Sequence, residues 1–152
     1  MEKISVALGT REFPSDYTCD GADRSPPLHI GGLNEKVVAL AVIMEDSSAP
    51  GGGTFAHWII WNIEAVRILP EGLPKDPEIT FPVRAVQGKN DFGRIGYSGP
   101  CPPSGDAHRY IFKVYALDAE IPLPAGVSKA ELVSALSGHV IQFGEAQAIY
   151  SR

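Results

Sequence analysis

The sequence contains little cysteine: only Cys19 and Cys101 occur, and neither belongs to a Cys-x-x-Cys pair. This spacing argues against a zinc site built from cysteine. The sequence also lacks an apolar stretch long enough to span a membrane. Residues 1–5 lack the apolar core of a signal peptide. We therefore expect a cytoplasmic protein with no membrane span, in which both thiols are reduced.

Basic residues are also in deficit. The chain has 13 Lys and Arg against 18 Asp and Glu, a net charge of −5 at pH 7, and no run rich in Lys or Arg. This balance argues against nucleic acid as a partner. The content of 44% hydrophobic and 20% charged residues is typical of globular proteins, and 152 residues fit one domain spanning residues 1–152.

Glycine and proline are abundant, with 16 and 13 residues, and are scattered between apolar runs. Their distribution favours many turns and short strands over disorder. Unbroken apolar runs predict core strands at residues 37–44, 58–63 and 110–117. Residues 3–8 alternate in polarity and predict an edge strand. The proline-containing residues 64–96 predict an irregular connection with local order or a function of its own.

Helical signals are confined to the C-terminal part of the sequence. Ser128 and Glu131 have the spacing of a capping box, and Gly138 is a suitable stop. We expect one short helix at about residues 129–137, whereas residues 141–150 fit either a strand or a short helix. The sequence thus predicts a mainly β domain with one or two short helices.

Residues 99–110 combine a stiff loop with polar side chains. The first half holds three prolines and two glycines, so it can be neither a helix nor the inside of a sheet. It leads directly into an apolar strand and delivers His108, Arg109 and Tyr110 to the end of that strand. Polar groups on a rigid edge favour a binding site. The plain alternative is a turn whose histidine is only hydrogen-bonded.

Three polar residues lie at the ends of the three core strands. Asp46 follows the first strand, His57 opens the second and His108 opens the third. If these strands are neighbours in one sheet, the three side chains meet at a common rim.

Strand alternation assigns the neighbouring side chains to faces. It places His108 and Tyr110 on one face, and it also groups Phe55 with His57. Arg109 then points to the opposite side, where we expect a buried ion-pair partner and not a ligand-binding group.

Several motifs occur in the order and rough spacing of one known family. They are Thr-Cys-Asp-Gly at 18–21, Ser-Pro-Pro-Leu at 25–28, Glu-Asp-Ser-Ser-Ala-Pro at 45–50, His-Trp at 57–58, Gly-Pro-Cys-Pro-Pro at 99–103 and His-Arg-Tyr at 108–110. With these motifs the chain resembles the phosphatidylethanolamine-binding proteins, in particular their short prokaryotic Raf-kinase-inhibitor-like branch. The resemblance covers about residues 18–117 and continues weakly to the C-terminus.

The resemblance implies a single-domain β-sandwich with a large antiparallel central sheet, short peripheral helices and an anion-binding pocket that needs no cofactor and performs no turnover. By position in the motifs, the pocket residues are Asp46, Pro50, Phe55, His57, Pro103, His108 and Tyr110. The implied partners are a small phosphate-like or carboxylate anion, a protein kinase or serine protease, and a second copy of the chain.

One motif departs from the family pattern. The family commonly has Asp-Pro-Asp-Ala-Pro, and this chain has Ser47 and Ser48 in place of the first proline and the second aspartate. The pocket therefore loses a formal negative charge and should accept anions more easily. Asp46 still repels an anion at pH 7. We expect one imidazole to pair with Asp46 and the other to donate to the anion.

Two enzymatic alternatives remain. Asp46, His57 and His108 could form a facial triad for metal-assisted hydrolysis, although their sequence neighbours are prolines and aromatic residues with no obvious further carboxylate. A serine hydrolase is the other alternative, but the chain has no Gly-x-Ser-x-Gly elbow. Its candidate nucleophiles are Ser47, Ser48 and Ser98.

Overall fold

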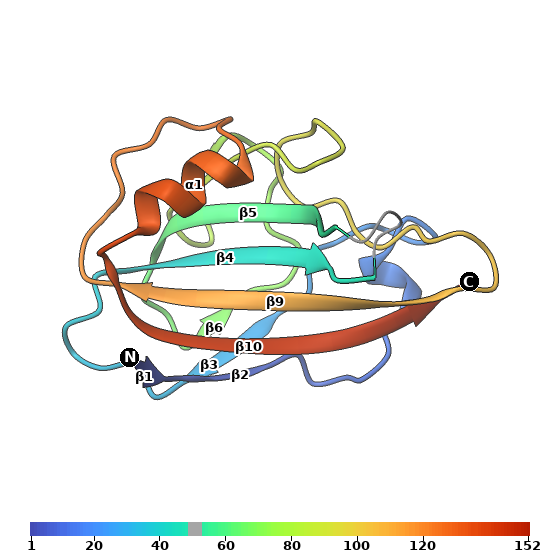
Figure 1. Ribbon diagram of the computed structural model, residues 1–152, viewed down its shortest axis with the longest axis horizontal. Helices are drawn as coiled ribbons and strands as arrows, with labels where there is room; N and C mark the ends of the chain where they lie inside the picture. Colours follow the sequence, from blue (N-terminus) through green and yellow to red (C-terminus); the bar gives the residue numbers. More distant parts are fainter. Residues whose placement is uncertain (49–52) are drawn as a thin grey trace.

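The computed structural model describes residues 1–48 and 53–152, which form two β-sheets flanked by short helices (Figure 1). The larger sheet has the order β1-β10-β9-β4-β5-β8-β7, and the smaller sheet has the order β2-β3-β6. The strands of the larger sheet are β1 (Glu2–Lys3), β4 (Ala39–Asp46), β5 (Phe55–Glu64), β7 (Glu78–Ile79), β8 (Ala85–Gln87), β9 (Ala107–Leu117) and β10 (Val140–Ser151). Those of the smaller sheet are β2 (Ser5–Ala7), β3 (Leu28–Gly31) and β6 (Ile68–Leu69). The helices are the 3-10 helix η1 (Ser15–Tyr17) and α1 (Lys129–Leu136).

The three predicted core strands are confirmed as β4, β5 and β9, the centre of the larger sheet. Neighbouring strands in this sheet are antiparallel except β1, which is parallel to β10. Each of the three strands also extends further at the end where the polar residues lie than its apolar run alone predicts. The predicted β-sandwich of mainly β structure is therefore confirmed.

Two apolar layers hold the domain together. One lies between the two sheets and includes Leu28 of β3 and Trp58 of β5, and the other lies under α1 and includes Leu132 and Trp61. Both tryptophans are fully buried, on opposite faces of β5. Each contributes a large apolar area to a different layer.

The predicted helix is confirmed with its capping box. The Ser128 side chain accepts from the Glu131 backbone N–H, and the Glu131 side chain accepts from the Ser128 backbone N–H. The helix ends at Leu136, and Gly138 follows with a φ of 85°, a backbone conformation in which glycine has no steric penalty.

The predicted edge strand at residues 3–8 is only partly correct. The chain bends at the buried Ile4, so β1 becomes an edge of the larger sheet and β2 an edge of the smaller one. The ambiguous residues 141–150 belong to strand β10, which pairs with β9 along nearly its whole length. Residues 64–96 have local order of their own and contribute the short strands β6, β7 and β8.

Helix α1 is fixed to the sheet by a buried carboxylate. Glu45 on β4 is 2% exposed and forms ion pairs with Lys129 of α1 and, at 2.9 Å, with Lys113 of β9. Burial by itself would raise the pKa of Glu45, but hydrogen bonds from the two ammonium groups outweigh it and hold the pKa below its usual range. The carboxylate is therefore ionised, and its ion pairs stabilise the fold.

We expect Glu45→Gln to lower the free energy of unfolding by about 1.5–3 kcal/mol at pH 7, because two charge-assisted hydrogen bonds weaken. Both lysines are partly exposed and can turn to water, so the loss is smaller than for an orphaned buried charge. The depressed pKa means that the stabilisation is present above the unfolded-state pKa and is lost as pH falls through the folded-state pKa. Urea unfolding of the wild type and of Glu45→Gln, from neutral to acidic pH, measures the difference in the free energy of unfolding. A difference that persists in acid would contradict the stabilising role assigned to the Glu45 ion pairs.

The prediction of two reduced thiols is wrong, because Cys19 and Cys101 form a disulfide. They are 82 residues apart in the sequence but lie in two loops that meet beside the ends of the core strands. The Cys19 N–H also donates to the Pro100 carbonyl at 3.1 Å, so the two loops are joined by backbone as well as by sulfur. The prediction rested on an assumed reducing compartment and not on the distance between the loops, which the sequence does not specify.

Candidate functional site

A cavity of about 160 Å³ opens where β4 ends and where β5 and β9 begin. Its walls are formed by Asp46, Phe55, His57, Phe92, Cys101, Pro102, Pro103, His108 and Tyr110. We call it the rim pocket. Six of the residues assigned from the sequence lie in this wall, and the seventh, Pro50, lies outside the described residues.

Strand register explains why these residues meet. Asp46 lies opposite Tyr110 on one side and opposite Phe55 on the other, because β4 is the strand between β9 and β5. His108 is two positions from Tyr110 on β9, and His57 is two positions from Phe55 on β5. Both histidines therefore point to the same face as Asp46. The predicted common rim is thus confirmed.

The Asp46 carboxylate is held by two hydrogen bonds. Its Oδ2 accepts from His108 Nδ1 at 2.6 Å, and its Oδ1 accepts from the Ser48 backbone N–H at 2.8 Å. Both side chains of the Asp46–His108 pair are less than a tenth exposed. The expected pairing of one imidazole with Asp46 is therefore present, and it leaves His57 as the second imidazole.

His57 is oriented from behind the pocket. Its Nδ1 lies 2.7 Å from the Ser98 carbonyl oxygen, which can only accept, so Nδ1 carries a hydrogen and Nε2 is the nitrogen left for a ligand. Burial lowers the pKa of His57, although its hydrogen bond to Ser98 and the Asp46 charge oppose the shift. In the free protein the ring is therefore neutral at pH 7.

Aromatic rings enclose His57. The ring centroids of Phe55, Phe92 and Tyr110 lie 5.2, 5.3 and 5.3 Å from that of His57, each in an edge-on arrangement. Burial raises the pKa of the Tyr110 phenol, so it stays neutral and can donate its O–H at ordinary pH. The rim pocket thus combines apolar walls with a few donors and one carboxylate.

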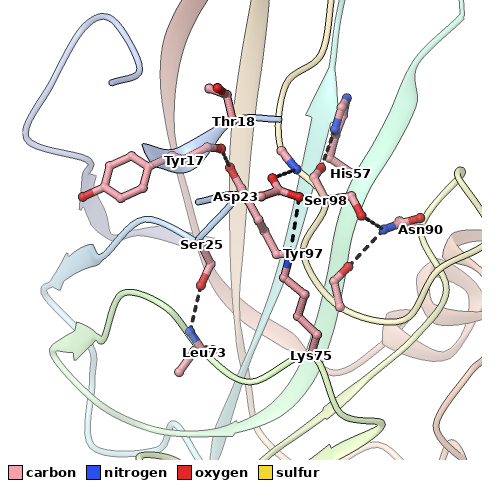
Figure 2. A network of polar contacts seen from close by, with 12 residues as sticks. Tyr17, Thr18, Asp23, Ser25, His57, Leu73, Lys75, Asn90, Tyr97 and Ser98 are labelled. Carbon is pink, nitrogen blue, oxygen red and sulfur yellow. Dashed lines mark hydrogen bonds and ion pairs between the residues drawn. The ribbon is translucent and has the colours of Figure 1, made fainter. Parts of the chain in front are cut away.

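A polar network positions the loop that carries Ser98 (Figure 2). The buried Asn90 donates from Nδ2 to the Ser98 hydroxyl at 3.0 Å and to the Gly96 carbonyl at 3.1 Å. Tyr97 donates its hydroxyl to the Tyr17 carbonyl at 2.6 Å. These bonds fix the segment that ends in the proline-rich wall.

Asp23 and the disulfide complete the attachment of this segment. Asp23 accepts from the Gly99 N–H at 2.7 Å and pairs with Lys75 at 3.4 Å (Figure 2). A side chain at Gly99 would collide with the Tyr17 carbonyl, so the loop can approach so closely only because this residue is glycine. Cys101, which lines the rim pocket, is tied to the same N-terminal loop through Cys19.

Phe92, Cys101 and Pro102 line the rim pocket but were not among the residues predicted for the site. The signal that could have indicated Phe92 is the turn sequence Asn-Asp-Phe-Gly at 90–93. Here Asn90 Oδ1 accepts from the backbone N–H groups of Phe92 and Arg94, at 3.0 and 3.2 Å. The turn therefore places an aromatic ring against Phe55 and His57.

The prediction of a buried ion pair for Arg109 is wrong. Arg109 does point away from the rim pocket, as strand alternation requires, but its side chain is exposed. It has no ion pair within residues 1–48 and 53–152. The physical reason is that α1 covers the opposite end of this sheet face, near Tyr115 and Val140, and leaves the Arg109 end open.

A metal-assisted reaction would need a group of metal-ligating side chains in the part of the chain that the structure describes. Its His, Cys, Asp and Glu side chains form no group of three or more that could hold a metal ion. Within the same residues, no helix has the length and apolar character needed to cross a bilayer.

Comparisons with known proteins identify the family and the fold of the chain. The family model for phosphatidylethanolamine-binding protein matches residues 3–151. A UPF0098 protein of Pyrococcus horikoshii is 53% identical over 152 residues, covering 99% of this chain and 76% of the relative. The crystal structure of YbcL from Escherichia coli, described as a new member of the mammalian PEBP family, has a TM-score of 0.87 and 33% identity, covering 99% of both chains.

A more distant structure shares the fold alone. The carboxypeptidase Y inhibitor, solved in complex with its cognate proteinase, is 14% identical with a TM-score of 0.50, covering 97% of this chain and 82% of that one. The match over residues 3–151 and the close relatives show that the chain belongs to the phosphatidylethanolamine-binding protein family. Within the family it lies in the prokaryotic branch of YbcL and the UPF0098 proteins.

Proposed function

We propose that this protein is a binding protein for small anionic groups, phosphate-like or carboxylate, which it holds in the rim pocket without turnover. The observation that carries the proposal is the orientation of His57. Its Nδ1–H is committed to the Ser98 carbonyl, so protonation at Nε2 would create a charged donor in a preformed cavity with aromatic walls.

Charge balance supports this assignment. Asp46 would repel an anion, but one of its oxygens is covered by His108 and the other by the Ser48 N–H. The family's second aspartate is replaced by Ser48, so Asp46 is the one acidic side chain in the described wall. A single proton added to His57 therefore offsets the carboxylate and makes the pocket receptive to an anion.

The proposal can be tested with the chain's own histidines. Two of the four, His57 and His108, line the rim pocket, whereas His29 and His139 lie outside it. Titration with glycerophosphoethanolamine, followed by the imidazole proton signals in NMR spectra, should move the first two signals saturably. The signals of His29 and His139 serve as internal controls. Absence of saturation, or equal shifts of all four signals, would contradict the proposal.

Inhibition of a protease or protein kinase is a second proposed role. The protease part of this role is suggested by the carboxypeptidase Y inhibitor, a protein of the same fold that was solved in complex with its cognate proteinase. At 14% identity this likeness carries the fold only. Assays of representative serine proteases and kinases with the purified protein test this role separately from anion binding.

A further inference from the structure

The described wall of the rim pocket contains no lysine or arginine, although it is proposed to hold an anion. One arginine nevertheless contacts a wall residue from outside. The Arg94 guanidinium carbon lies 5.6 Å from the centroid of the Phe92 ring, and that ring lies 5.3 Å from the ring of His57. Arg94 is therefore one aromatic ring away from the proposed anion donor.

Arg94 is held in this place by its turn. Asn90 is 3% exposed, and its side-chain oxygen accepts from the Arg94 N–H while its side-chain nitrogen donates to the Gly96 carbonyl and to Ser98. The Asn90 backbone N–H also donates to the Arg94 carbonyl at 2.8 Å. The same buried amide thus fixes both the Ser98 segment that orients His57 and the turn that carries Arg94.

The guanidinium of Arg94 is available for a ligand. Arg94 is exposed, and across residues 1–48 and 53–152 it forms no ion pair, in contrast to Arg24 and Arg152, whose guanidinium groups pair with aspartates at 2.7 Å. A guanidinium at this distance over the face of an aromatic ring can still offer its N–H donors to carboxylate or phosphate oxygens.

We propose that Arg94 is a specificity-determining residue that selects ligands carrying two acidic groups. The first acidic group occupies the rim pocket beside His57. The second acidic group lies at the pocket mouth, where it accepts hydrogen bonds from the Arg94 guanidinium, with the Phe92 ring between Arg94 and His57. The favoured ligand class is therefore a small molecule in which a short spacer joins a phosphate to a second acid. This inference rests on the proposed anion binding and adds to it the chemistry outside the pocket.

A matched pair of ligands isolates the contribution of Arg94. Ethyl phosphate and 2-phosphoglycolate share the phosphate and the number of carbons, but only the second carries a carboxylate. Calorimetric titration at one pH and low salt gives the ratio of their affinities for each variant. The informative variants are Arg94→Gln, which removes the charge, and Arg94→Lys, which keeps the charge without the planar fork.

Arg84→Gln is the matched control. Arg84 is also an exposed arginine, but it lies beside Glu64 at the other end of β5, one strand length from the rim pocket. Its loss changes the net charge as much as the loss of Arg94 does. The comparison therefore separates a local contact from a general electrostatic effect.

We expect Arg94→Gln to weaken phosphoglycolate binding roughly three- to tenfold, while ethyl phosphate binding stays unchanged. Arg94→Lys should retain part of the preference, and Arg84→Gln all of it. An unchanged ratio in Arg94→Gln, or equal weakening of both ligands, would overturn the inference while leaving anion binding in place. Failure of the wild-type protein to bind either phosphate would refute the proposed function itself, and the inference with it.

Discussion

Replacement of Cys19 and Cys101 together by serine is expected to lower the free energy of unfolding by about 4–5 kcal/mol. The disulfide closes a loop between residues 82 positions apart, and such a loop restricts the unfolded chain strongly. Much of the domain's stability would be lost, because folded domains are typically stable by only about 5–15 kcal/mol. Equilibrium unfolding in guanidinium chloride measures the difference.

Reduction of the wild-type protein provides the matched control, since it breaks the same bond without changing a side chain. The reduced wild type and the double variant should unfold at similar denaturant concentrations, both well below the oxidised protein. Equal midpoints for the oxidised and reduced wild type would show that the loops stay together without the covalent link. The disulfide would then contribute little to stability.

Binding of glycerophosphoethanolamine is expected to be stronger at pH 6 than at pH 8.5. Burial lowers the pKa of His57 in the free protein, and a bound anion stabilises the protonated ring, so the pKa in the complex is higher. Affinity is therefore greatest below the free-state pKa, falls as pH rises through the bound-state pKa, and levels off above it. The phosphodiester keeps its charge across this range, so the titration belongs to the protein.

His57→Gln tests the assignment of this titration. Loss of the charge-assisted hydrogen bond should weaken binding at pH 6 roughly tenfold or more, and should remove most of the pH dependence. His139→Gln is the control, because His139 is a partly exposed histidine whose Nδ1 lies 3.0 Å from Asp118, outside the rim pocket. Equal binding of the diester at both pH values would show that histidine is not the partner of the anion.

The elements that the sequence predicts well are those whose own residues carry enough information. Three core strands follow from unbroken apolar runs, and α1 follows from the Ser128–Glu131 capping box. The sequence left β10 open between a strand and a short helix, because its polar and small residues give no clear periodicity. Its pairing with β9 is what makes it a strand. The bend at Ile4 likewise depends on the whole fold, because β1 pairs with the edge strand β10 of the larger sheet and β2 with β3 of the smaller sheet.

The site shows the same division. The positions of Asp46, His57, His108 and Tyr110 follow from strand ends and alternation, and the structure brings them together. Phe92 was missed because it reaches the pocket through a turn made by Asn90. The direction of Arg109 was predicted correctly, but the expected buried ion pair does not form, because α1 covers only the other end of that sheet face. The Cys19–Cys101 bond depends on two loops far apart in the sequence, and their distance in space cannot be deduced from either loop alone.

The disulfide also determines how the molecule would respond to mechanical force. Strands β4 and β5 lie inside the covalent loop from Cys19 to Cys101, whereas β9 and β10 lie outside it. A pull applied to the two ends of the chain would extend only the residues outside the loop, because the sulfur bond carries the load past those inside. In the order of the sheet, the pull would reach β10 first and then β9, whose pairing with β4 runs beside the rim pocket, while the part of the pocket on β5 would remain shielded from the pull.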